Sequence, residues 1–236
     1  MTLLISGRTL TVYGLEAELP GKQVQISGLV KPVVYLHIYE EEEGAAVYKL
    51  LQGKCILICI SGNVWEKEFT PWPAAAIDKR QGQFSGGAPA YVRLLTETII
   101  PEAEQRLQLN VQKRILAGYS LAGLFALYAA CESHLFDGVA SASGSLWYEN
   151  FVEWAGNHFP RGRWDGLTTV PVYLSLGDKE SRSKNVLLQQ NEKVLRAVAA
   201  AWDAHNRVKV ELNPGGHFQD AELRTARGIL WVLGQV

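Results

Sequence analysis

Short apolar runs alternate with stretches of helical periodicity along most of the chain. Continuous apolar runs are typical of strands buried on both faces of a sheet, whereas apolar residues spaced by three and four predict amphipathic helices. The predicted strands cover residues 33–39, 54–60, 115–117, 136–143, 170–176 and 207–212. The predicted helices cover residues 44–52, 90–109, 183–205 and 219–233, with one more from residue 121 onward. This alternation predicts an α/β fold with a mostly parallel central sheet and helices on both faces.

The remaining segments are less regular. Residues 3–30 hold short β-like pieces broken by glycines, which predicts an antiparallel edge of the sheet. Residues 64–89 predict one long loop, and a loop of that length in a compact domain is usually functional. Residues 146–164 are aromatic and irregular, which favours a lid-like insertion. Pro101 predicts a kink in its helix. Because no linker or repeat interrupts the pattern, we expect a single domain over residues 1–236.

A strand, a sharp turn and a helix follow one another at residues 112–123, where the sequence is QKRILAGYSLAG. In that context a G-x-S-x-G pattern marks a nucleophile elbow, and Ser120 is the candidate nucleophile. Gly118 precedes it by two residues, and Ala122 replaces the last glycine of the pattern. The helix that follows would direct its free N–H groups and its dipole at the same point, which favours an oxyanion. The alternative is that Ser120 is an ordinary helix N-cap.

Reactive residues also follow three other predicted strands. In open parallel sheets, active sites form at the carboxyl ends of the strands. His217 follows the last strand and two glycines, so we predict that it is the general base. Asp178 and Glu180 follow the strand that ends near Gly177, and we favour Glu180 over Asp178 as the acid that orients the histidine. The chain order of serine, acid and histidine is that of the α/β-hydrolases.

An oxyanion site needs two N–H donors. The first is expected from Leu121, directly after the candidate nucleophile. For the second we predict Asn63, with Gly62 as the alternative, because both follow the apolar run at 54–60. An ordinary turn at residues 61–63 would explain those residues equally well. The aromatic residues expected to wall a substrate pocket are Trp65, Trp72, Tyr119, Trp147 and Tyr148.

Composition narrows the classes of function. The chain has 23 Lys and Arg against 24 Asp and Glu, and no basic stripe that would bind nucleic acid. The glutamates at 40–43 are interpreted as a short solvated patch. No apolar stretch is long enough to span a membrane, and residues 1–11 lack the pattern of a signal peptide. Cys55, Cys59 and Cys131 lie in apolar runs without metal-site spacing, which favours reduced thiols in the cytoplasm.

The other histidines have simpler interpretations. His37 lies inside a predicted strand, where a structural role is more common than a catalytic one. The remaining three follow helices or lie in the aromatic segment, so we expect them at the surface: His134, His158 and His205.

These motifs resemble the esterase D and enterochelin esterase-like branch of the α/β-hydrolases, also called the putative esterase family. The similarity covers nearly the whole chain and is most specific at residues 70–73, 118–123, 143–148 and 215–218. It implies a triad of Ser120, His217 and Glu180 or Asp178, with Ser61-Gly62-Asn63 in place of the Asp-Gly turn that supplies an oxyanion donor in the family. Some siderophore esterases of the family carry an additional N-terminal domain, which we do not expect here.

The resemblance and the motifs together predict a serine hydrolase that cleaves carboxylic esters, either small acyl esters or siderophore-type esters, through an acyl-enzyme. No metal or organic cofactor is implied, and the expected partner is a small-molecule ester. A thioesterase or acyltransferase on the same triad is the alternative, and a non-catalytic binding protein on a hydrolase scaffold is a third hypothesis. Neither the acyl group, the alcohol nor the oligomeric state follows from the sequence.

Overall fold

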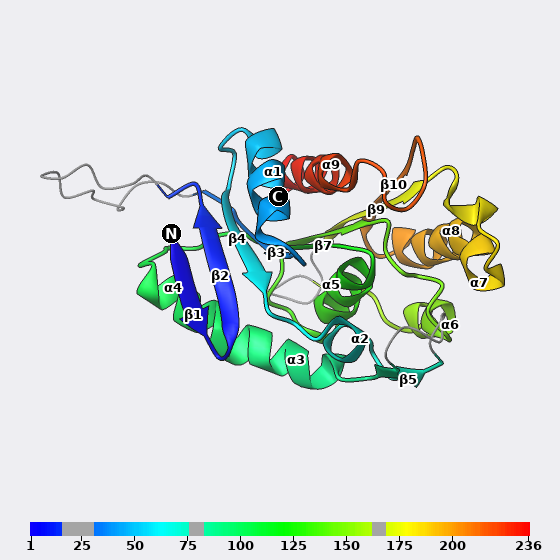
Figure 1. The fold of residues 1–236 in the computed structure, drawn as a ribbon, viewed down its shortest axis with the longest axis horizontal. Coiled ribbons are helices and arrows are strands. Elements are labelled where there is room, and N and C mark those ends of the chain that lie inside the picture. The colour runs from blue at the N-terminus through cyan, green and yellow to red at the C-terminus, as the bar shows by residue number, and fades with distance from the viewer. Residues whose placement is uncertain (16–30, 76–82, 162–168) are drawn as a thin grey trace, which may run out of the picture.

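The computed structural model describes residues 1–15, 31–75, 83–161 and 169–236. Within them, eight strands form one sheet in the order β1-β2-β4-β3-β7-β8-β9-β10 (Figure 1). Neighbours from β4 to β10 are parallel, whereas β1 and β2 pair antiparallel with each other and β2 with β4. The strands are Thr2–Ile5 (β1), Arg8–Tyr13 (β2), Val33–His37 (β3), Ile56–Ser61 (β4), Arg114–Tyr119 (β7), Gly138–Ala142 (β8), Pro171–Gly177 (β9) and Arg207–Asn213 (β10). The sheet confirms the predicted mostly parallel α/β fold and its antiparallel edge; residues 16–30 of the predicted edge lie outside the described residues.

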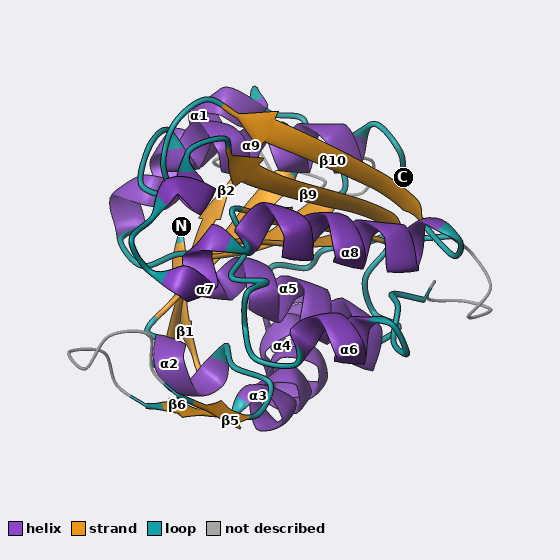
Figure 2. Ribbon diagram, turned by 90° about the vertical axis from the view of Figure 1, so that its right-hand side faces the viewer, coloured by secondary structure: helices purple, strands orange, loops and turns teal. Residues whose placement is uncertain are grey.

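Helices cover both faces of the sheet, as predicted. Helices α1 (Glu41–Leu51) and α9 (Ala221–Leu233) lie together on one face, and α5 (Leu121–Glu132) packs against β7 and β8 on the other. Figure 2 shows α8 (Asn191–Asp203) lying along β9 and β10. Side chains of each central strand alternate between the two faces, so that Tyr35 faces one core cluster and Val34 the other.

The residues at 40–43 are largely exposed to solvent, as predicted, and they also form the start of a helix. Glu40 is the N-cap of α1, and Glu43 completes a capping box with it. Three glutamates in the first turn complement the positive end of the helix dipole, so α1 begins three residues earlier than predicted.

Pro101 lies in a continuous helical stretch made of α3 (Ala88–Leu94), the π-helical turn η1 (Leu95–Ile99) and α4 (Ile100–Arg106). The π turn precedes the proline, which has no N–H to donate. Such bulges are a recognised cause of helix bending. The helix therefore continues through Pro101, and the turn before the proline changes from α-helical to π-helical.

Two predicted segments are divided differently in the structure. The long helix expected at 183–205 is two pieces, α7 (Val186–Gln189) and α8, and the short helix η2 (Glu180–Arg182) precedes them. The Asn185 side chain accepts from Leu187 N–H, so α7 begins three residues later than predicted. The loop expected at 64–89 contains a short helix and a two-stranded ladder. These elements are α2 (Trp65–Glu68), β5 (Pro73–Ala74) and β6 (Phe84–Ser85).

The described part of the aromatic segment packs into the core. Tyr148 and Phe151 are buried, and α6 (Phe151–Ala155) is tied to α8 by Trp202, whose indole N–H donates to the Ala155 carbonyl at 2.9 Å. Residues 162–168 of this segment lie outside the described residues. In the part of the chain that the structure covers, no helix is long and apolar enough to cross a bilayer.

Candidate active site

Ser120 occupies a strained turn between β7 and α5. Its φ of 56° and ψ of −123° lie outside the conformations that non-glycine residues prefer, and such strain concentrates at functional sites. A Cβ at Gly118 would lie 2.2 Å from the Ala122 carbonyl oxygen, and one at Gly123 would lie 2.9 Å from Ser141 Oγ. Glycine is therefore required at both positions, and the local geometry is that of the predicted elbow.

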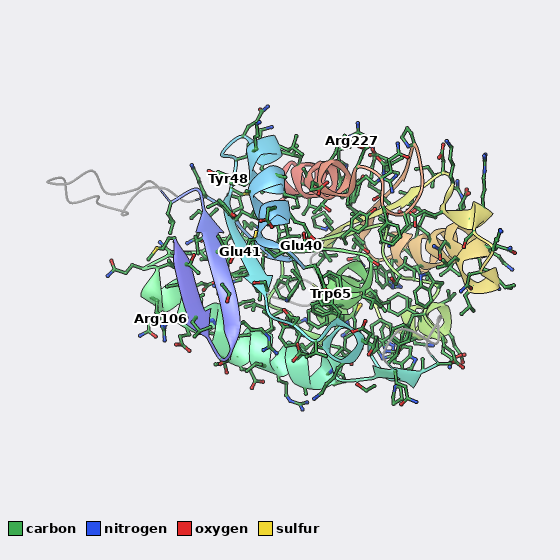
Figure 3. All side chains as sticks on the ribbon, viewed as in Figure 1. Glu40, Glu41, Tyr48, Trp65, Arg106 and Arg227 are labelled. Atoms are coloured by element: carbon green, nitrogen blue, oxygen red, sulfur yellow. The ribbon has the colours of Figure 1, made fainter. Side chains whose placement is uncertain are left out.

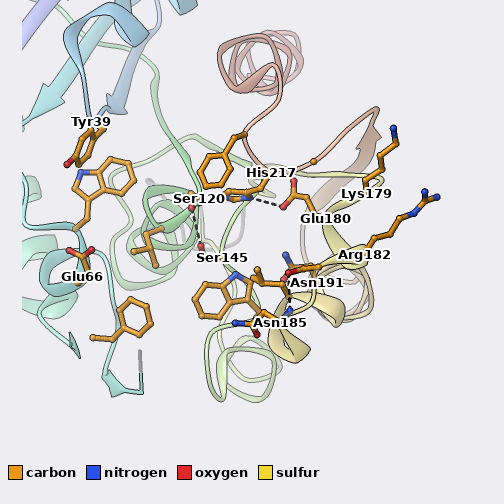
Figure 4. Close-up of a pocket in the computed structure, with 18 residues that line it drawn as sticks. Tyr39, Glu66, Ser120, Ser145, Lys179, Glu180, Arg182, Asn185, Asn191 and His217 are labelled. Carbon is orange, nitrogen blue, oxygen red and sulfur yellow. Dashed lines mark hydrogen bonds and ion pairs between the residues drawn. The ribbon is translucent and has the colours of Figure 1, made fainter. Parts of the chain in front are cut away.

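Ser120 occupies the N-cap position of α5, but its hydroxyl makes no capping hydrogen bond, so helix capping does not account for a serine here. Instead, its Oγ lies 3.0 Å from His217 Nε2 and 3.4 Å from Ser145 Oγ. On the other side of the ring, His217 Nδ1 lies 2.8 Å from Glu180 Oε2. Figure 4 shows the resulting line from hydroxyl to imidazole to carboxylate. The structure thus brings together three residues that the sequence predicted.

Glu180 is held as a carboxylate. Burial alone would raise its pKa, but hydrogen bonds from His217, the Gly177 N–H and the Ser143 hydroxyl outweigh that effect and lower the pKa below its usual value. The Gly177 and Ser143 donors lie 2.7 and 2.8 Å from Oε1. A charged, immobile carboxylate beside Nδ1 can fix the tautomer of His217 and stabilise the imidazolium.

Asp178 has a different place. It is exposed, and its Oδ1 accepts from the Gly215 N–H at 2.8 Å. Asp178 therefore fastens the loop that carries His217 and does not contact the imidazole.

A cavity of about 1040 Å³ opens beside Ser120 and His217. Figure 4 shows Tyr39 and Glu66 on one side of it and Lys179 and Arg182 on the other. The two ends consequently carry opposite charges, and their field favours one orientation of a charged ligand.

Only some of the predicted aromatic residues line that cavity. Trp65 and Trp147 do, and Tyr119 lines a smaller adjoining cavity of about 300 Å³. Trp72 and Tyr148 do not: the Trp72 indole N–H donates to the Glu149 carbonyl, and the Tyr148 hydroxyl donates to the Trp72 carbonyl. These two residues fasten one loop to another, because their polar atoms reach backbone groups in the neighbouring segment.

Asn63 is not positioned beside Ser120. It follows β4, which β3 separates from β7, and its side chain donates to Glu68 at 3.0 Å. The segment after β3 leads instead to Tyr39, which lines both cavities together with Ser120. The sheet order therefore corrects the prediction of Asn63 and identifies Tyr39 as the candidate for the second backbone donor. Leu121, the candidate for the first, is the opening residue of α5 and lines the large cavity.

Besides Tyr39, two further site residues were missed at the level of sequence. Ser145 is buried against Ser120 and belongs to a segment that the motif analysis noted without assigning a role. Arg224 is buried in α9. In the sequence it looks like any other polar residue of an amphipathic helix. No local signal in the sequence distinguishes a buried arginine from an exposed one.

The other histidines lie where the sequence predicted. His37 is buried, its Nε2 lies 2.8 Å from the Tyr91 hydroxyl, and burial lowers its pKa to about 3. His134, His158 and His205 are exposed. All three cysteines are free, with Cys55 and Cys59 buried and Cys131 partly exposed. Among the residues with described positions, no three His, Cys, Asp or Glu side chains are grouped so as to hold a metal ion.

The fold agrees with that of solved hydrolases. An IroE-like serine hydrolase from Shewanella oneidensis superposes with a TM-score of 0.75 at 18% identity, over 96% of this chain and 76% of that one. At this identity the likeness shows the α/β-hydrolase fold.

Relatives in sequence come from Bacillus subtilis (strain 168). The uncharacterized protein YbbA is 33% identical over 132 residues, which are 55% of this chain and 51% of YbbA. The ferri-bacillibactin esterase BesA is 23% identical over 159 residues, which are 66% of this chain and 55% of BesA. The chain thus spans about half the length of these curated relatives. Residues 37–219 match the family model Esterase, described as "Putative esterase". Since that match covers most of the chain and includes the elbow and the histidine loop, the chain belongs to the Esterase family.

Proposed function

We propose that this protein is a serine hydrolase of carboxylic esters. The observation that carries the proposal is the continuous hydrogen-bonded line from Ser120 through His217 to Glu180 beside a large cavity. A hydroxyl bonded to a histidine that is itself oriented by a carboxylate is the arrangement that activates a serine nucleophile. Membership of the Esterase family supports the same reaction class.

The steps follow from the positions of these groups. Ser120 Oγ attacks the ester carbonyl while His217 Nε2 takes its proton, and Glu180 stabilises the imidazolium. The oxyanion is held by two backbone N–H groups, those of Leu121 and Tyr39. His217 then gives the proton to the departing alcohol, and water attacks the acyl-enzyme by the same route in reverse.

The choice of Tyr39 rests on more than sheet order. Its N–H points at a carboxylate oxygen of Glu43, at 3.3 Å, so it already faces a negatively charged acceptor. Glu43 lines the smaller cavity beside Ser120, where an incoming oxyanion would compete for that N–H. An oxyanion site requires an N–H group that is not already bonded within the sheet and that faces an anion, and the Tyr39 N–H meets this requirement.

The size of the cavity and the name of one relative indicate which classes of ester to test first. The cavity would admit a large ester, and Trp65, Phe84 and Trp147 supply apolar wall. The relative described as a ferri-bacillibactin esterase supports including siderophore-type esters beside small acyl esters. The free thiols of Cys55 and Cys59 fit a reducing compartment, and we propose the cytoplasm.

A fluorophosphonate probe tests the proposal directly. We expect stoichiometric modification of the folded protein at Ser120, because only a serine activated by a base reacts readily with such a probe. Peptide mass spectrometry would locate the adduct, and hydrolysis of p-nitrophenyl esters and of a catechol trilactone would be followed in parallel. An adduct elsewhere, or no adduct and no turnover, would count against the proposal. Faster turnover of thioesters, or acyl transfer to an added alcohol, would change the reaction class but keep the nucleophile.

The two neighbouring acids offer a matched pair of variants. We expect Glu180→Gln to lower kcat/KM by about 10³- to 10⁴-fold, because an amide neither stabilises the imidazolium nor secures the correct tautomer. Asp178→Asn should lower it less than about tenfold, since the amide oxygen can still accept from Gly215. Steady-state kinetics on one p-nitrophenyl ester compares them. Equal losses in the two variants would contradict the assignment of Glu180.

A further inference from the structure

Arg224 is a buried cation directly behind the proposed catalytic group. It lies in the first turn of α9, and its side chain is only 1% exposed. Its Nη1 lies 3.3 Å from Glu180 Oε1 and 3.2 Å from Ser143 Oγ, and its Nη2 donates to the Pro214 carbonyl at 2.8 Å. A fully buried guanidinium is costly to desolvate, so its partners must compensate for the lost water.

The two oxygens of Glu180 have separate partners. Oε1 accepts from the Gly177 N–H, the Ser143 hydroxyl and Arg224, whereas Oε2 lies against His217 alone. Because Oε1 is held from three directions, the carboxylate cannot rotate, and Oε2 stays directed at the imidazole. A Cβ at Gly177 would lie 2.9 Å from Arg224 Nη1 and 3.0 Å from Glu180 Oε1. The absence of a side chain there leaves room for the ion pair.

Arg224 also contacts the loop that carries His217. Pro214, which accepts from Nη2, is three residues before the histidine. The Tyr119 hydroxyl donates to the His217 carbonyl and lies 3.3 Å from Arg224 Nη1. One guanidinium therefore joins the acid, the histidine loop and the residue next to Ser120.

We propose that Arg224 is a positioning residue: it orients Glu180 toward His217 and shares the negative charge of the Glu180 carboxylate with the imidazole. This inference rests on the function proposed above. The order of groups is guanidinium, carboxylate, imidazole, so the carboxylate is shared between two cations whenever His217 is protonated. The neutral form of His217 is the one that acts as a base, and Arg224 competes with the imidazolium for the Glu180 carboxylate.

Other charged or titratable groups also face this region, and they define the controls. Around Glu180 and His217 these groups include Tyr39 after β3, Tyr119 from β7, Asp178 and Lys179 after β9, Arg182 in η2, Glu43 in α1, Glu66 in α2 and Glu222 in α9. Arg224 is the cation among them that bonds to the Glu180 carboxylate. Arg227, one turn further along α9, is exposed at the surface (Figure 3) and contacts Asn213 and Glu211. It provides the same charge on the same helix without the contact to Glu180.

The experiment compares Arg224→Gln, Arg224→Lys and the control Arg227→Gln. The titration of the His217 imidazole is followed by NMR, with the resonance assigned through His217→Gln, and kcat/KM is measured across pH. In Arg224→Gln the titration midpoint and the acid limb of kcat/KM should move up by about half a pH unit or more, because a nearby positive charge is lost. Arg224→Lys keeps the charge but not the forked contacts, so its midpoint should stay while kcat falls several-fold.

Each result decides the inference. An unchanged midpoint in Arg224→Gln, or an equal shift in Arg227→Gln, would overturn the electrostatic part. A wild-type kcat in Arg224→Lys would overturn the positioning part. If Arg224→Gln does not fold, Arg224→Lys still tests the second part, and the double variant Glu180→Gln/Arg224→Gln, which removes both buried charges, tests the first. That double variant should titrate His217 at a higher pH than Glu180→Gln alone, because it lacks the positive charge of Arg224, and equal midpoints would overturn the electrostatic part. The imidazole titration needs no turnover, so it remains readable even if Ser120 proves not to be the nucleophile.

Discussion

Replacing Ser120 with alanine is expected to lower kcat/KM for p-nitrophenyl esters by at least about 10⁴-fold. The hydroxyl is the nucleophile in the proposed mechanism, so its loss removes the route through a Ser120 acyl-enzyme. Residual turnover would come from water placed in the cavity near His217 and the backbone donors. The measurement is steady-state hydrolysis with enough enzyme to detect rates close to the uncatalysed reaction.

The folded state of the Ser120→Ala variant should be preserved. Ser120 Oγ caps no helix, and its partners at 3.0 and 3.4 Å are a partly exposed ring and another hydroxyl. Alanine keeps the Cβ that the elbow already accommodates. Ser133→Ala, at the other end of the same helix, is the matched control and should retain full activity. If Ser120→Ala kept more than a few per cent of wild-type kcat/KM, the nucleophile would have to be sought elsewhere.

The fold was predictable because its signals are local. The central strands are continuous apolar runs between turns, and the elbow needs small residues that the sequence displays. Errors arose where one side chain sets a boundary. Asn185 caps α7 and moves the start of the predicted helix from residue 183 to Val186, and Glu43 completes a cap that moves the start of α1 to an earlier residue.

The site was predicted only where a residue's role follows from its strand. Ser120, Glu180 and His217 each follow a parallel strand, and the carboxyl ends of those strands meet at one edge. The second oxyanion donor depends on strand order, which the sequence does not display: β3 precedes β4 in the chain, yet β3 is the one beside β7. Assigning the donor to Asn63 assumed the wrong neighbour, and Tyr39 follows once the order is known.

The hydrophobic periodicity of the sequence did not predict which individual side chains line the cavity or pack elsewhere. Trp65 and Trp72 have the same hydrophobicity and lie in the same segment, but one lines the cavity and the other fastens a loop to the Glu149 carbonyl. Arg224 is the extreme case, because an arginine on a helix is normally solvated. Its proposed role depends on contacts with Glu180 and Tyr119, which are over 40 and over 100 positions away in the chain. Such long-range pairs appear only when the chain is folded.

His217→Gln is expected to lower kcat/KM by about 10⁴-fold or more, comparable to the loss of the nucleophile, because residues that act as a unit fail together. Glutamine can still donate an amide hydrogen to Glu180, so the variant separates hydrogen bonding from proton transfer. It cannot take the Ser120 proton at neutral pH, and the acid limb of the pH profile should disappear with the titrating group. His134→Gln, at an exposed position, should behave as wild type.

A second variant at the same position makes the argument sharper. His217→Ala removes a side chain that is 27% exposed and lines the large cavity, which leaves an opening next to Ser120 that a free imidazole can enter. Added imidazole should restore part of the activity in His217→Ala, and none in the double variant with Ser120→Ala. If the activity restored to His217→Ala rises with the neutral fraction of the added imidazole, the group missing from this variant is a base. Failure of rescue together with unimpaired labelling of Ser120 would mean that the histidine holds the loop rather than carrying the proton.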